Sequence, residues 1–143
     1  MMLNAGFKIW IGIDPGTDTG FAIWNKPEKK LVEVKTLRIH RAMAKVLELH
    51  NSNPGEVFVR FEDSRLRKWL QNKTPETIQG AGSIKRDCSI WEDFLKDHNI
   101  PFASLAPGKG MTKWRPEIFK QSTNYMGITS HHGRDAALLV FGK

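Results

Sequence analysis

Three acidic residues border strongly apolar runs, and their types and spacing suit chemistry at a bound metal ion. Asp14 ends the first run within Gly-Ile-Asp-Pro-Gly, Glu62 follows residues 57–61, and Asp135 precedes residues 136–141. An acid in such a place is costly to bury unless its charge is compensated. Because carboxylate oxygens are the ligands that Mg²⁺ prefers, the three acids together predict a divalent cation site.

Each acid also has an ordinary structural interpretation. Asp14 could cap a hairpin turn, since Asp-Pro-Gly is common turn chemistry. Glu62 could be a strand-end acid in water, and Asp135 could be stabilised by the dipole at a helix start. On a helix, His131 or His132 can share a face with Asp135, because residues three or four apart are neighbours. The evidence for a site is the combination of these residues.

The hydrophobic pattern predicts the strands that would position the first acid. Residues 7–14 alternate between isoleucine-rich and other positions, which indicates a strand with Asp14 on the face opposite the isoleucines. Turn residues separate it from two further expected strands over residues 20–25 and 31–37. We expect an antiparallel meander of three strands.

A crossover connection would place the second acid beside the first. Apolar residues recur at helical spacing over residues 39–50, and residues 57–61 form a β-branched and aromatic run. Strand, helix and strand at this spacing predict a fourth strand parallel to a neighbour in the sheet. If that neighbour is the first strand, Asp14 and Glu62 lie side by side at carboxyl ends, where open α/β sheets usually carry their sites.

The remaining elements follow from shorter patterns. A helix is expected from about residue 74 to 99, although its interior glycines Gly80 and Gly82 leave open a later start at Ser83. Its Ile84, Cys88, Trp91 and Leu95 share one face that suits either the core or a contact between helices. We also expect a short strand, a helix and a Ser130-capped terminal helix over residues 102–105, 116–122 and 130–141.

Composition favours a single domain with a polyanionic partner. The chain has 143 residues, 40% of them apolar, and carries 22 Lys and Arg against 15 Asp and Glu, a net charge of +7. The lone Cys88 excludes an internal disulfide, and no Cys/His spacing suits zinc. No apolar run approaches the roughly 18 residues that cross a membrane. We therefore expect one cytoplasmic domain over residues 1–143 with no membrane partner.

Basic residues gather after the second acid and suit contacts to phosphate. The same residues could equally form an exposed loop and the start of a helix. If they contact DNA, their neutralisation should reduce the salt dependence of binding. The predicted DNA-binding residues are Arg65, Arg67, Lys68, Lys85, Arg86 and Lys113.

The order of these motifs resembles the RuvC-like Holliday-junction resolvases of the RNase H-like superfamily. Three motifs carry the resemblance: Gly-Ile-Asp-Pro-Gly, an expected strand that ends in Glu62, and His-x-x-Asp from His132 to Asp135 at the start of an Ala/Leu-rich helix. The likeness spans about residues 7–142, and the short chain is more similar to phage-encoded members, which act in a bacterial host cell. It implies an RNase H-like α/β fold, with a five-stranded mixed sheet of three antiparallel strands followed by parallel strands, and helices on both faces.

The resemblance also implies an activity. The family has four metal-binding positions, and by motif match three of them are the carboxylates Asp14, Glu62 and Asp135. His132 takes the fourth position, where many bacterial relatives have Asp. Together they would hold two Mg²⁺ or Mn²⁺ ions and hydrolyse phosphodiesters of branched DNA, especially four-way junctions, as a homodimer. Two alternatives stay open: a ribonuclease acting on RNA–DNA hybrids, and a non-catalytic nucleic-acid-binding module on the same fold.

Overall fold

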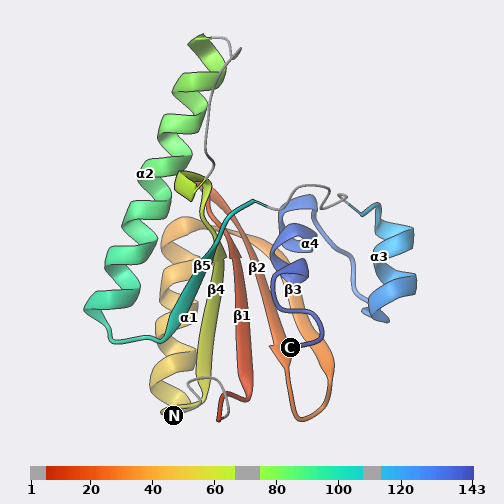
Figure 1. Ribbon diagram of the computed structural model, residues 1–143. Coiled ribbons are helices and arrows are strands. Elements are labelled where there is room, and N and C mark those ends of the chain that lie inside the picture. The colour runs from red at the N-terminus through yellow and green to blue at the C-terminus, as the bar shows by residue number, and fades with distance from the viewer. Residues whose placement is uncertain (1–5, 67–74, 108–113) are drawn as a thin grey trace.

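The protein folds around one five-stranded mixed sheet (Figure 1). The computed structural model describes residues 6–66, 75–107 and 114–143, with the backbone alone described for residues 75–81. The strands lie in the order β3-β2-β1-β4-β5. Their bounds are β1 Ile9–Asp14, β2 Asp18–Asn25, β3 Lys30–Arg38, β4 Val57–Glu62 and β5 Phe102–Leu105.

The expected strand arrangement is confirmed. β1 and β2, and likewise β2 and β3, pair antiparallel, while β4 pairs parallel with both β1 and β5. The connection from the meander to β4 runs through α1, Ile39–Ser52. Because α1 buries Ala42 and Val46 one turn apart against the sheet, its apolar face is the one that the sequence period indicates.

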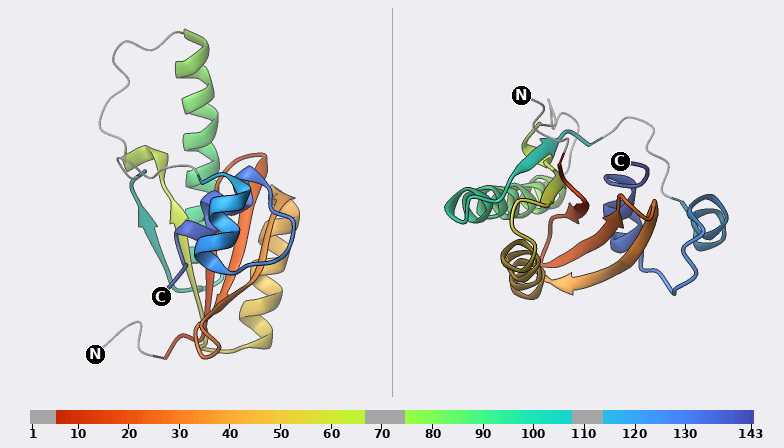
Figure 2. Two further views of the ribbon diagram at one scale, coloured as in Figure 1. Left: turned by 90° about the vertical axis from the view of Figure 1, so that its right-hand side faces the viewer. Right: turned by 90° about the horizontal axis from the view of Figure 1, so that it is seen from below.

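Helices cover both faces of the sheet, as Figure 2 shows from below, where the sheet separates α1 from α4. α1 and α2, Pro75–Asp97, bury their apolar residues with Ile11, Ile13 and Phe61 on one face. α3, Pro116–Thr123, and α4, His131–Leu138, pack with Trp10 and Phe58 on the other. Both faces of β1 are therefore buried, which matches its nearly continuous apolar sequence.

The structure decides two questions that the sequence left open. α2 begins at Pro75 and not at Ser83, so its glycines lie inside the helix. Cys88, Trp91 and Leu95 are fully buried in the α1 side of the core, whereas Ile84 on the same helical stripe is 42% exposed. Most of that face is therefore core.

The last helix is shorter than predicted. α4 ends at Leu138 and not at residue 141, because the N–H groups of Leu139 and Val140 donate to carbonyls three residues back and tighten the turn. The chain then turns at Gly142, whose φ is 83°. In the described parts of the chain, no helix combines the length and apolar character needed to cross a membrane.

Candidate active site

Two of the predicted acids end neighbouring parallel strands. Ile13 of β1 is in register with Phe61 of β4. The residue after each of them is the last of its strand, Asp14 in β1 and Glu62 in β4. Both side chains are partly buried. The two acids therefore lie at the same edge of the sheet, as the crossover predicted.

Glycines allow α4 to lie directly on the sheet beside this edge. A Cβ added at Gly12 would overlap the carbonyl oxygen of Ala136, and one at Gly20 would overlap that of His132. The Cβ at Gly20 would also lie 2.9 Å from the Cβ of Asp14, its partner in register. Only glycine permits so close an approach, so these two positions bring the first turn of α4 to Asp14.

A cap at the start of α4 fixes that turn. Ser130 Oγ accepts a hydrogen bond of 3.1 Å from the N–H of Gly133 and lies 2.6 Å from the Oγ1 of Thr36 in β3. Gly133 rests on the backbone of β3, where an added Cβ would come within 2.8 Å of the Lys35 nitrogen. The helix start is thereby attached to the strand farthest along the meander.

The two histidines of α4 take different partners. His132 Nδ1 lies 3.3 Å from Asp14 Oδ2, with the His132 side chain 45% exposed and the Asp14 side chain 16% exposed. His131 Nε2 lies 3.4 Å from Asp135 Oδ2, one helical turn away. Helix geometry allows Asp135 to pair with either His131 or His132. The structure shows the pair with His131, while His132 points to the sheet.

The candidate residues thus form two pairs, Asp14 with His132 and His131 with Asp135, and Glu62 lies at the end of the neighbouring strand β4. Within residues 6–66, 75–107 and 114–143, no three His, Cys, Asp or Glu side chains lie close enough together to form a metal-binding group. The donor types still fit the expected cation, because three carboxylates and an imidazole are ligands that Mg²⁺ or Mn²⁺ accepts. Asp14 and His132 lie in contact, with Asp14 Oδ2 3.3 Å from His132 Nδ1.

A buried ion-pair network lies directly after Glu62 and was not predicted. The carboxylate of Asp63, 2% exposed, accepts hydrogen bonds of 2.8 and 2.7 Å from Nε and Nη2 of Arg65. Arg65 Nη2 also lies 2.5 Å from Oε1 of Glu92 on α2. The network joins the end of β4 to α2, which fixes the chain immediately beyond a candidate ligand.

Charge pairing sets the ionisation of this network. The guanidinium of Arg65 lowers the pKa of Asp63, and the two carboxylates raise the pKa of Arg65. Lys96, and after it Arg65, lowers the pKa of Glu92. A sequence signal did exist: Asp63 Oδ1 accepts the N–H of Arg65 two residues on, at 3.0 Å, a turn that Asp favours.

Cys88 packs against the same end of β4. Its Sγ lies 3.7 Å from the carbonyl oxygen of Glu62 and 3.7 Å from Ser64 Oγ, and burial raises the pKa of its thiol. The residue supports the strand end from the α2 side.

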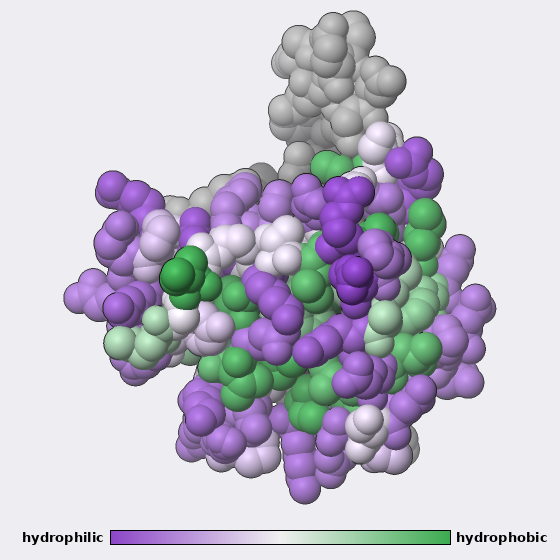
Figure 3. All heavy atoms as spheres, turned by 180° about the vertical axis from the view of Figure 1, so that it is seen from behind, coloured by the Kyte–Doolittle hydropathy of each residue, from purple (hydrophilic) through white to green (hydrophobic). Residues whose placement is uncertain are grey.

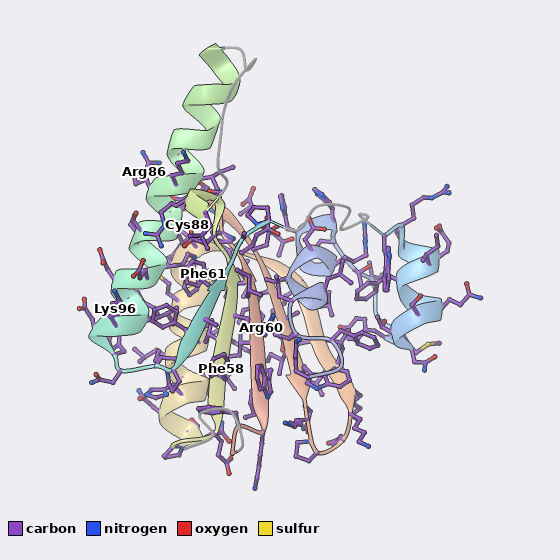
Figure 4. The ribbon with its side chains drawn as sticks, viewed as in Figure 1. Phe58, Arg60, Phe61, Arg86, Cys88 and Lys96 are labelled. Carbon is purple, nitrogen blue, oxygen red and sulfur yellow. The ribbon has the colours of Figure 1, made fainter. Side chains whose placement is uncertain are left out.

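The predicted DNA-binding residues lie in three settings. Lys85 and Arg86 lie on α2, where Lys85 is partly buried and Arg86 is exposed, and Figure 4 labels Arg86 on that helix. Arg65 is 29% exposed and engaged by Asp63 and Glu92, which gives it a structural role; its contact with DNA stays a prediction. Arg67, Lys68 and Lys113 lie outside the described residues.

Comparison with protein-family models and with curated proteins gave no match to this chain.

Proposed function

We propose that the protein is a metal-dependent endonuclease that cleaves four-way junctions or other branched DNA, a RuvC-like member of the RNase H-like superfamily. The observation that carries the proposal is the contact of Asp14 with His132, at the sheet edge where β4 ends in Glu62. It unites the first and last motifs of the sequence, 118 residues apart.

The topology supports the proposal. Three antiparallel strands, a crossover helix, a parallel strand ending in Glu62 and a final helix carrying Asp135 follow the order that the family resemblance implies. The carboxyl edge of a parallel pair is also where α/β sheets usually hold their ligands.

The residues have complementary roles in this mechanism. When bound, two Mg²⁺ or Mn²⁺ ions would activate water and stabilise the departing oxygen. Asp14, Glu62 and Asp135 would hold them. In our proposal, His132 orients Asp14 through Nδ1, whose distance from Asp14 Oδ2 is 3.3 Å. The family resemblance implies products with a 5′-phosphate and a 3′-hydroxyl.

Charge supports a DNA substrate. The net charge of +7 and the exposed cations of α2 favour a polyanion, and backbone contacts can select a branched shape without contacting base edges. In our proposal Lys85 and Arg86 contact phosphates.

We further propose that the enzyme acts as a homodimer through the amino-terminal half of α2. This half extends past the edge of the sheet in Figure 1. Ile84 is 42% exposed there, and a Cβ added at Gly82 would meet nothing within 4 Å among the described residues. An exposed isoleucine beside open helix surface suits packing against a second copy.

The test is cleavage of a synthetic four-way DNA junction in Mg²⁺ and in Mn²⁺, with linear duplex, flap and RNA–DNA hybrid as comparison substrates. The matched variants are Asp14→Asn and Asp18→Asn. Asp18 is an acid four residues away whose ion pair with Arg38, at 3.1 Å, is exposed. We expect Asp14→Asn to lower the cleavage rate by roughly a hundredfold or more, while junction binding persists. This loss is larger than the roughly 10–100-fold typical when a residue that only supports a metal ligand is replaced. Asp18→Asn should cut normally.

The outcomes separate the candidate functions. Paired nicks on the junction alone indicate a resolvase, and equal cutting of flaps indicates a general debranching nuclease. Cleavage of hybrid but not of junctions would make the protein a ribonuclease. Junction binding without any cutting would leave a nucleic-acid-binding module, and full activity of Asp14→Asn would refute the site.

A further inference from the structure

Arg60 lies in the middle of the sheet, on the face that carries α4. It is in register with Gly12 of β1 and Ala103 of β5. Its neighbours along β4, Val59 and Phe61, belong to the core on the opposite face. Since successive side chains of a strand alternate, Arg60 shares its face with Glu62. Figure 4 shows Arg60 near mid-sheet, whereas Arg86 and Lys96 lie along α2.

Among the described residues, Nε of the Arg60 guanidinium lacks a protein acceptor. This nitrogen is buried and makes no hydrogen bond within that part of the chain. No carboxylate of that part forms an ion pair with it, in contrast to Arg65, which has two. A buried donor without an acceptor is unfavourable, because it has lost its hydrogen bonds to water and has formed none within the protein.

A second cation, Lys143, ends the segment that packs on this part of the sheet, since a Cβ added at Gly12, the register partner of Arg60, would lie 3.4 Å from Val140 Cγ2. The positive charge of Arg60, and after it partial burial, lowers the pKa of the Lys143 ammonium group. The chain at Lys143 is held in place, since Trp24 Nε1 donates a hydrogen bond of 3.0 Å to its carbonyl oxygen. Two neighbouring cations repel each other, and a bound anion would relieve that repulsion.

We propose that Arg60 and Lys143 form a phosphate-binding site for the backbone of a nucleic acid, beside the candidate active site. The nucleic-acid ligand rests on the proposed function. A guanidinium fork binds a phosphate with two parallel hydrogen bonds, and an ammonium adds a point charge. Arg60 precedes Glu62 by two residues, roughly 7 Å along the strand, so the phosphate would neighbour the one that is cleaved.

The experiment measures binding of a fluorescent four-way junction by anisotropy over a range of NaCl concentrations, in Ca²⁺, which is expected not to support cleavage. The variants are Arg60→Met and Lys143→Met, with Arg41→Met as the control. Arg41 is an exposed cation on α1, on the opposite side of the sheet. We expect Arg60→Met to weaken binding about tenfold and each site variant to reduce the slope of log affinity against log salt by roughly 0.9, the value for one lost phosphate contact. Arg41→Met should match wild type.

A melting curve for each variant guards against loss of the fold. Arg60→Met should melt no lower than wild type, since it removes a cation that has no ion-pair partner in the described part of the chain. If it does unfold, Lys143→Met alone decides. Wild-type affinity and slope in the folded site variants would overturn the inference, as would a wild-type protein that binds no DNA. Binding that weakens as expected in a protein that never cleaves DNA would support the phosphate site while refuting the nuclease.

Discussion

Glu62 and Asp63 are adjacent acids with opposite surroundings. Glu62 ends β4 on the face of α4 and Arg60, whereas Asp63 turns to the α2 side and is almost fully buried against Arg65. The alternation of side chains along an extended chain produces this division. We assign Glu62 to the chemistry and Asp63 to holding the strand end.

At this scale we predict that Arg65→Met destabilises the protein by about 3 kcal/mol near neutral pH, because it leaves the buried Asp63 carboxylate without a counter-charge. The pKa of Asp63 is lowered in the folded state, so its contribution is present above the ordinary pKa near 4 and is lost as pH falls through the folded value. The difference between wild type and variant should therefore shrink below about pH 4. Urea denaturation at pH 7 and pH 3.5 measures both quantities.

Arg38→Met is the matched control. The pair of Arg38 with Asp18 is exposed on both sides, so its loss should cost less than about 1 kcal/mol at either pH. If Arg65→Met is as mild as this control, the buried network does not stabilise the end of β4.

At the scale of elements, the position of α4 depends on two glycines of the sheet. Gly12 and Gly20 lie on adjacent strands, and the carbonyl oxygens of α4 occupy the space where their side chains would be. The helix therefore lies closer to the sheet than it could if either position carried a residue with a side chain. This proximity is what places His132 against Asp14.

We predict that Gly20→Ala displaces the start of α4, because the added methyl group would meet the His132 backbone and Asp14 together. Such overpacking against backbone should destabilise the protein by roughly 1–3 kcal/mol and abolish junction cleavage even where the protein stays folded. Thermal melting and the cleavage assay, on the same preparation, measure the two effects.

Gly6→Ala serves as the control, since an added Cβ there meets nothing within 4 Å in the described chain and should change neither stability nor activity. An active and fully stable Gly20→Ala would show that α4 tolerates a greater distance from the sheet.

At the scale of the molecule, hydrophobic residues remain on the surface. Seen from behind in Figure 3, hydrophilic residues dominate the outline, with groups of hydrophobic ones among them. Ile84 on α2 and Ile118 on α3 are exposed to 42% and 44%. Ile90 on α2 is exposed to 44% as well, but Ile84 lies in the amino-terminal half of that helix, the half that extends past the sheet, and we therefore place the dimer contact there.

We therefore predict that Ile84→Glu converts a dimer to a monomer, because a charge at the contact would be buried without a partner. Sedimentation equilibrium at several protein concentrations measures the mass, and paired nicking of a junction should become single nicking. Ile118→Glu makes the same chemical change at equal exposure and should leave the mass unaltered. A monomeric wild type, or a dimer that survives Ile84→Glu, would contradict this assignment of the contact.

The sequence by itself determined the order of the strands and helices and which strand ends would carry acids, but not where α2 begins or where α4 ends. These are local properties: the two-residue period of β1, the helical spacing of α1 and the turn residues between them act over a few residues. The crossover helix also predicted that β4 is parallel to a neighbouring strand. The tertiary structure decided that this neighbour is β1.

Only the tertiary structure decided which side chains meet. His132 could have faced Asp135, yet it contacts Asp14 because two glycines bring α4 onto β1 and β2. Arg65, whose contact with phosphate stays a prediction, is engaged by Glu92, 27 residues further along the chain, a contact that the sequence pattern did not indicate. Such contacts depend on how distant elements pack, and the period of a sequence carries no information about which distant residue will face a given side chain.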